Sequence, residues 1–142
     1  MAYQLEGEWM GDVNDVLDAI KAFDYYWAPQ GYWAVDGRKS AIEQRLRPLV
    51  GNAFDDRWVF SMIVKLEEGN FIPPHEDKPL APGVTRRHLV LSANDKSWCM
   101  HGNEWQQLDV GGVYTMEPQY VHAAINWGVE PRIHLVVDSA ND

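Results

Sequence analysis

The chain has 142 residues, of which 46% are hydrophobic, and its formal net charge is −9. This length is typical of one domain with its own hydrophobic core, so we expect a single domain over residues 1–142. The acidic balance argues against binding to nucleic acid or to an anionic membrane surface, because both need clustered lysine and arginine side chains.

Cysteine usage and the N-terminus predict a cytoplasmic protein. Cys99 is the single cysteine of the sequence, which excludes an internal disulfide and a zinc site built from cysteines. The start, MAYQLEGEWMGD, has no basic residues followed by an apolar run, so we expect no signal peptide. No apolar stretch reaches the roughly 20 residues of a membrane-spanning helix, so we expect no membrane partner.

The first part of the chain, residues 1–56, is expected to form a helical and aromatic support for the rest. Residues 1–9 predict a short strand or an extended lead-in. Apolar residues then recur at helical spacing in VNDVLDAIKAF. Asp12 or Asn14 is expected to cap the N-terminus of this helix, because a short polar side chain there accepts a hydrogen bond from a free backbone amide.

A second helix is expected from Ser40, where SAIEQRLRPLV begins. Glu43, three residues on, completes a capping-box pattern. Pro48 limits how far the helix extends, because proline lacks the amide hydrogen and clashes with the preceding turn. The aromatic segment before this helix, YYWAPQGYWAVDGR, predicts a loop with one short strand.

From residue 57 to residue 138 the pattern changes to short apolar segments separated by turn sequences. Short strands at close spacing after a helical beginning are typical of a double-stranded β-helix, or jelly roll. We therefore predict a mainly β (α+β) fold with a jelly-roll core at 57–138 and the helices packed outside it. The predicted strands are WVFSMIVKL, FIPPH, RRHLVLSA, SWCMHG, EWQQLD, GVYTME, VHAAINW and RIHLVVD.

The chemically most informative segment is FIPPHEDKP, which ends a predicted strand with His75 and Asp77. Side chains two residues apart leave the same face of a strand, so this imidazole and this carboxylate can converge while Glu76 turns away. With one more distant histidine they would form the two-histidine, one-carboxylate triad of non-haem Fe(II) oxygenases.

The later strands offer the missing parts. His122 begins a strand after a proline-containing turn, as expected for a residue at the mouth of a barrel, whereas His101 precedes a Gly-Asn hairpin turn and is expected on the surface. If GVEP joined two antiparallel strands, Arg132 and His134 would share the inner face with His122. A buried arginine needs a partner, and its planar fork suits a carboxylate.

In order and spacing, HEDKP, RRHLVLSA, GGVYTME and YVHAAINWGVEPRIHLVVD resemble the aspartyl/asparaginyl β-hydroxylase family of 2-oxoglutarate- and Fe(II)-dependent oxygenases. The resemblance covers about residues 58–138. It implies that His75 and His122 ligate iron, and that Arg132 pairs with the distal carboxylate of 2-oxoglutarate. Some animal members lack the carboxylate ligand, whereas Asp77 completes the triad here.

Three further roles come from the same resemblance. His88, in the R-x-H-L pattern, would make a second contact to the co-substrate, and Arg86 would lie near the substrate. Ser61 would also contact 2-oxoglutarate. The implied reaction is hydroxylation of a C–H bond in an amino acid or peptide residue. Fe(II) is the implied metal cofactor, 2-oxoglutarate and O2 are consumed, and succinate and CO2 are released. The substrate is expected to carry a carboxylate, and its contacts are expected from the aromatic segment 25–33 and the loop KPLAPGVT.

Competing hypotheses remain at this stage. A cupin-like metal- or ligand-binding module without turnover would share the jelly roll and the His/Asp cluster, and a structural domain with incidental histidines is a third class. Arg132 could instead form a salt bridge with Glu130 or Asp138. His88 and His134 could make internal hydrogen bonds, and Asn126 could bind a ligand or cap the turn that follows it.

Overall fold

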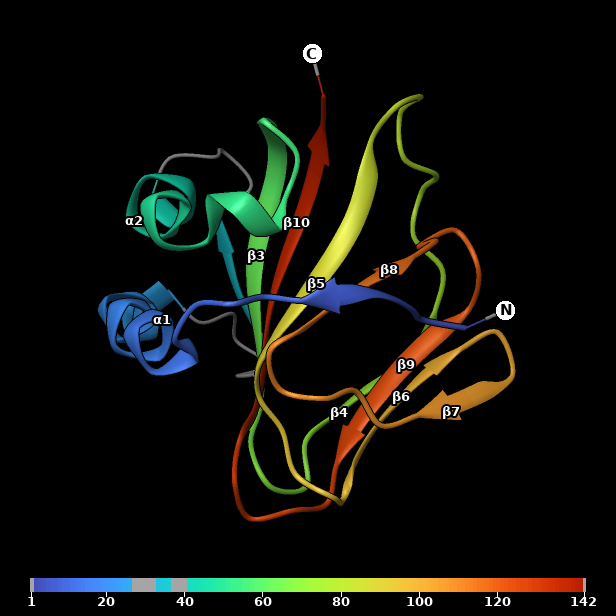
Figure 1. Ribbon diagram of the computed structural model, residues 1–142. Helices are drawn as coiled ribbons and strands as arrows, with labels where there is room; N and C mark the ends of the chain where they lie inside the picture. Colours follow the sequence, from blue (N-terminus) through green and yellow to red (C-terminus); the bar gives the residue numbers. More distant parts are fainter. Residues whose placement is uncertain (1, 27–32, 37–40, 142) are drawn as a thin grey trace.

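Two antiparallel sheets face each other in the computed structural model, which describes residues 2–26, 33–36 and 41–141. Within that part of the chain, the larger sheet has the strand order β1-β8-β5-β10-β3-β2 and the smaller sheet the order β4-β9-β6-β7. Helices α1 and α2 pack on the outer face of the larger sheet (Figure 1). The predicted jelly-roll architecture is confirmed.

The strands of the larger sheet are drawn from both ends of the chain. They are β1 (Gln4–Glu8), β2 (Trp33–Asp36), β3 (Arg57–Leu66), β5 (Thr85–Ser92), β8 (Gly112–Met116) and β10 (Arg132–Ala140). The smaller sheet consists of β4 (Phe71–His75), β6 (Ser97–His101), β7 (Glu104–Gln106) and β9 (His122–Asn126). Because β1 and β2 form the two edges of the larger sheet, the first 56 residues supply strands as well as support.

The helices form where the sequence predicts them. In α1 (Val13–Ile20) the Asp12 carboxylate accepts a hydrogen bond from the Asn14 amide at 2.8 Å, which is the expected N-cap. α1 continues into a 3₁₀ turn at Lys21–Tyr26. α2 (Ala41–Val50) includes Pro48 and ends two residues after it, before a 3₁₀ turn at Gly51–Ala53. The expected cap at Ser40 lies outside the described residues.

The core has two layers because the larger sheet is covered on both faces. Toward the helices, Ile63 and Leu135 pack against Leu46 and other buried helix residues. Between the sheets, Leu66 and Val90 belong to a second cluster. All nine residues of β10 are buried, as expected for a central strand with no face open to water.

Two expectations about loops need correction. GVEP does not join a hairpin but crosses from β9 in the smaller sheet to β10 in the larger one. The expected surface position of His101 is wrong: the hairpin forms, with His101 opposite Glu104 and Gly102 at φ 65°, yet His101 is only 2% exposed. Its Nε2 lies 2.9 Å from the Glu117 carbonyl oxygen, because its strand turns this side chain inward.

No helix in the described ranges is long and apolar enough to cross a membrane.

Candidate active site

A cavity of about 550 Å³ lies between the two sheets. Its polar lining brings together most of the residues singled out in the sequence, while the side toward β3 is apolar. The residues that line it include Tyr3, Phe60, Met62, Ile72, His75, Asp77, Lys78, Arg86, His88, His122 and Arg132.

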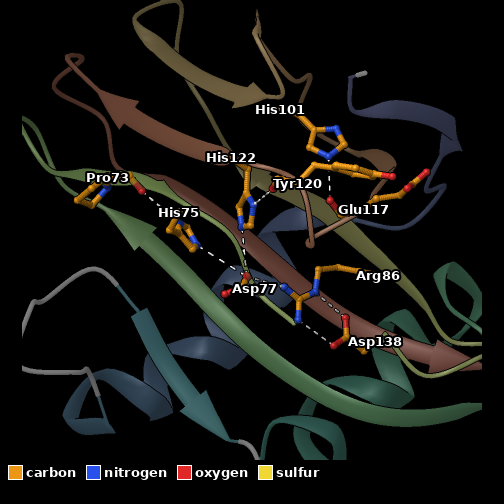
Figure 2. Close-up of polar contacts among 9 residues, drawn as sticks. All are labelled: Pro73, His75, Asp77, Arg86, His101, Glu117, Tyr120, His122 and Asp138. Atoms are coloured by element: carbon orange, nitrogen blue, oxygen red, sulfur yellow. Dashed lines mark hydrogen bonds and ion pairs between the residues drawn. The ribbon is translucent and has the colours of Figure 1, made fainter. Parts of the chain in front are cut away.

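His75, Asp77 and His122 converge at one place in this cavity (Figure 2). His75 lies at the end of β4, directly opposite His122 at the start of β9. Asp77 follows on a loop that is held by a hydrogen bond from its own amide to the Pro118 carbonyl at 2.9 Å. One ligand atom from each of the three residues lies within 4.8 Å of the others, so the structure assembles the predicted group.

Backbone carbonyls set the tautomers of both histidines. Nδ1 of His75 lies 2.8 Å from the Pro73 carbonyl oxygen, and Nδ1 of His122 lies 2.9 Å from the Tyr120 carbonyl oxygen. A carbonyl oxygen only accepts, so each Nδ1 carries the hydrogen. The lone pair of each neutral ring is therefore on Nε2, which is the arrangement that metal-binding histidines need.

The two Nε2 atoms face the same carboxylate oxygen. Oδ2 of Asp77 lies 3.7 Å from Nε2 of His75 and 3.2 Å from Nε2 of His122. Burial lowers the pKa of His122 below its usual value, and the neighbouring His75 and Arg86 act in the same direction, which favours the neutral ring. Three electron-pair donors that face one another repel unless a cation lies between them. Two imidazoles and one carboxylate fit Fe(II).

Arg86 is bound by two carboxylates. Its Nε and Nη2 donate to Asp138 at 2.7 Å and 2.9 Å, and its Nη1 lies 3.4 Å from Oδ2 of Asp77 (Figure 2). Burial lowers the pKa of Arg86, but its hydrogen bond and charge interaction with Asp138 outweigh this, so the net shift is upward. Arg86 therefore lies at the cavity as expected, with its guanidinium engaged within the protein.

Arg132 has no carboxylate partner among the described residues. It is 3% exposed, its Nη2 donates to the Cys99 sulfur at 3.2 Å, and its Nη1 is buried without a hydrogen-bond acceptor. Neither alternative salt bridge, with Glu130 or with Asp138, is found among the described residues. Asp138 lies six residues further along the same extended strand and pairs with Arg86. The chemistry of a buried guanidinium with a free donor at a cavity suits an anionic group.

His88 and His134 form a buried pair. Their Nδ1 atoms are 3.0 Å apart, and only His88 of the two lines the cavity. Burial and the positive charge of Arg132 lower the pKa of both rings well below the usual histidine value, so both are neutral and one Nδ1 donates to the other. His134 therefore orients the ring of His88.

Two further residues, Ser61 and Asn126, do not line the cavity. Ser61 is fully buried but lies between Phe60 and Met62, which line the cavity, so its side chain leaves the opposite face of β3. The geometry gives no support to the expected contact of Ser61 with 2-oxoglutarate. Asn126 donates to the Leu66 and Glu130 carbonyls, both at 2.9 Å, and accepts from the Gly128 amide, so it caps the turn.

Tyr3 and Asp138 were not anticipated at the site. Tyr3 lines the cavity from the N-terminal segment, and Asp138 holds Arg86. No local pattern marks either residue, because each reaches its neighbours through pairing of strands that are distant in the sequence.

The model of the aspartyl/asparaginyl beta-hydroxylase family matches residues 35–141. The chain belongs to this family. Membership makes it an oxygenase-type enzyme with a cupin-like fold and a candidate metal site at His75, Asp77 and His122.

Solved structures share the fold of this β-hydroxylase family member at low sequence identity. EvdMO1 is 19% identical with a TM-score of 0.72, covering 98% of this chain, which spans 47% of EvdMO1. AviO1 from Streptomyces viridochromogenes is 11% identical with a TM-score of 0.68, and the match covers 97% of this chain and 89% of the AviO1 chain. SnoN, a non-heme alpha ketoglutarate dependent epimerase from nogalamycin biosynthesis, is 12% identical with a TM-score of 0.66. The match covers 91% of this chain and 71% of the SnoN chain.

Proposed function

We propose that this protein is a 2-oxoglutarate- and Fe(II)-dependent dioxygenase that hydroxylates a C–H bond of an amino acid or peptide residue and releases succinate and CO2. One observation carries the proposal: the same cavity holds three converging electron-pair donors and a buried arginine with an unused donor. The first set suits a divalent metal and the second suits a carboxylate, so together they fit a metal-chelating dicarboxylate. SnoN, which shares the fold, is described as using the same co-substrate.

The proposed ligands of Fe(II) are Nε2 of His75, Nε2 of His122 and a carboxylate oxygen of Asp77. Bound Fe(II), with 2-oxoglutarate and O2, supplies the oxidising power that the protein's own side chains lack. The backbone carbonyls of Pro73 and Tyr120 keep both rings in the ligating tautomer. The protein thereby contributes a preset geometry, with both Nε2 atoms facing the position of the metal.

The rest of the cavity binds and orients. Arg132 would pair with the distal carboxylate of 2-oxoglutarate, and His88 would donate or accept one further hydrogen bond. Phe60, Met62 and Ile72 form an apolar wall that would pack against the carbon chain of a bound ligand.

A carboxylate-bearing substrate would meet Lys78 first. Arg86, the expected contact, already pairs with Asp138 and approaches Asp77. Lys78 lines the same cavity and has no ion-pair partner among the described residues. We therefore assign the attraction of a substrate carboxylate to Lys78, and we propose that Arg86 holds Asp77 in place.

The test is a succinate-release screen over free amino acids and peptides, with product masses checked for one added oxygen. Asp77→Ala should abolish succinate formation, because it removes one metal ligand. Glu76→Ala is the matched control, since Glu76 is exposed and does not line the cavity. Turnover that survives in Asp77→Ala and in His75→Ala would refute the ligand assignment.

An anaerobic titration separates the oxygenase from a binding module without turnover. Fe(II) and 2-oxoglutarate together should produce a visible charge-transfer band in the wild type. Arg132→Met should weaken the binding of 2-oxoglutarate strongly. Metal binding without the band, and without any effect of Arg132→Met, would favour the cupin-like binding module.

A further inference from the structure

Tyr3 reaches the cavity from outside the part of the chain that the family model matches. The match begins at residue 35, whereas Tyr3 lies just before the N-terminal strand β1. Its side chain is 5% exposed and lines the same cavity as Arg132 and His88. The residue therefore belongs to this site through the tertiary structure alone.

The position of Tyr3 is held from two sides. Its amide donates to the Gln106 side-chain oxygen at 2.7 Å, and its carbonyl accepts from the Gln106 side-chain nitrogen at 3.2 Å. Its ring packs edge-on against His88, with centroids 5.3 Å apart at 85°. The two hydrogen bonds with the Gln106 side-chain amide hold the backbone, and the phenol ring packs against the rings of both His88 and His101.

The phenol lies in the neighbourhood of the arginine that lacks a partner. Tyr3 and Cys99 belong to the same buried cluster between the sheets, and Arg132 donates to the Cys99 sulfur at 3.2 Å. A carboxylate has two oxygens with about four acceptor positions, so an arginine leaves room for a second donor.

We propose that Tyr3 donates its O–H to the distal carboxylate of 2-oxoglutarate beside Arg132, and so acts as a further co-substrate-binding residue. The inference rests on the proposed function. It assigns the N-terminal segment a part in co-substrate selection, in addition to pairing with β8.

The protonation state of Tyr3 supports the donor role. Burial is the largest influence on its pKa and raises it far above the usual tyrosine value. The phenol therefore stays neutral at every pH at which the enzyme would work, and it offers a hydrogen rather than a competing negative charge.

The experiment compares the binding of two oxoacids to the anaerobic Fe(II) protein by calorimetry. 2-Oxoglutarate has the distal carboxylate, and 2-oxopentanoate has the same chain length without it. Tyr3→Phe should weaken 2-oxoglutarate about ten- to a hundredfold, the usual range for a hydrogen bond to a charged group. It should leave 2-oxopentanoate unchanged, because the lost bond involves the distal carboxylate alone.

The matched control is Tyr114→Phe. Tyr114 is 5% exposed, as Tyr3 is, but its hydroxyl accepts from the Asp109 amide at 3.0 Å and it does not line the cavity. This variant should bind both oxoacids as the wild type does.

The outcomes separate the role of Tyr3 from the proposed function. Equal weakening of both oxoacids by Tyr3→Phe, or no weakening, would overturn the role of Tyr3 while leaving the proposed function intact. A wild type that binds no 2-oxoglutarate would overturn both. If Tyr3→Phe does not fold, Gln106→Ala takes its place, because Gln106 holds the backbone of Tyr3. Weaker binding of 2-oxoglutarate alone would support the proposal. Unchanged binding of both oxoacids would contradict it.

Discussion

The carboxylate of Asp77 must face the proposed metal position and also interact with Arg86. Its Oδ2 faces the two histidine nitrogens and also lies 3.4 Å from Arg86. An arginine that bound Asp77 fully would compete with a metal, whereas Arg86 is drawn the other way by its two shorter bonds to Asp138. Asp138 thus determines how strongly Arg86 holds the proposed metal ligand.

We expect Asp138→Asn to weaken metal binding about tenfold, which is the low end of the effect of residues that support a metal ligand. The amide cannot accept both bonds from Arg86, so Arg86 shifts its charge toward Asp77. Titration with Fe(II) or Mn(II) measures the change. Asp55→Asn is the control. Asp55 pairs at 2.7 Å with Arg87, which follows Arg86 in β5 and whose side chain therefore leaves the opposite face of the sheet. Equal effects of the two variants would contradict the role of Asp138.

The buried pair of His88 and His134 predicts a pH dependence of stability. Both pKa values are lowered in the folded protein, so below the usual value of about 6.5 the unfolded chain binds more protons than the folded one. Stability is therefore full above that pH and falls as the pH drops below it, by at most about 1.4 kcal/mol per pH unit for each group.

His134→Gln removes one titrating group and keeps a hydrogen-bonding partner for His88. In metal-free protein, the loss of unfolding free energy between pH 7.5 and pH 5.5 should be about 1 kcal/mol smaller in the variant than in the wild type. Urea unfolding at the two pH values measures the difference. The same pH dependence in both proteins would show that His134 is not the titrating group.

At the scale of the elements, Asn126 connects the end of β9 to β3 and to the loop that leads into β10. This side chain is fully buried and makes hydrogen bonds to Leu66, Glu130 and Gly128. Its Oδ1 also accepts from Asn94 at 3.0 Å. Asn126 is thus a central support of the crossing from the smaller sheet to the larger one, together with Asn94 and Ser92, which donate to the Glu130 and Pro131 carbonyls. The crossing leads directly into Arg132.

Asn126→Leu should lower the free energy of unfolding by about 2–4 kcal/mol, because several buried polar groups lose their partner together. Chemical denaturation gives the value. Asn70→Ala is the comparison, since Asn70 accepts one exposed local bond from the Glu67 amide and should cost less than about 1 kcal/mol. Similar losses in both variants would refute the structural role of Asn126.

The elements were largely predictable from the sequence because their signals are local. Helical spacing and an N-cap at Asp12 predicted α1, and alternation with turn sequences predicted the strands from β3 to β10. The burial of His101 was not predictable, because a hairpin turn beside a residue does not reveal which face of the strand the second sheet covers.

At the scale of the whole molecule, the candidate site joins residues from both sheets. His75 and His122 belong to the smaller sheet, and His88 and Arg132 to the larger one. A ligand that bridges these groups holds the two sheets together, so binding should stabilise the fold as a whole.

We expect Fe(II) with 2-oxoglutarate to raise the melting temperature. A ligand at 100 times its Kd adds about 2.7 kcal/mol, which corresponds to a rise of roughly 5–15 °C for a domain of this size. Anaerobic scanning calorimetry with and without a chelator measures the shift. Asp77→Ala should show little of it, and a shift of the same size in that variant would mean that the metal binds elsewhere.

By itself the sequence determined the strand and helix pattern, the family resemblance and the pairing of His75 with Asp77, because two residues on one face of a strand need no knowledge of the rest of the chain. The tertiary structure decided which groups meet across the cavity. In the folded protein Arg86 pairs with Asp138, and Arg132 keeps a donor without an acceptor. Ser61 does not line the cavity, whereas Tyr3 does. Such contacts depend on strand register and on which sheet each strand joins, and both are set by the packing of distant segments.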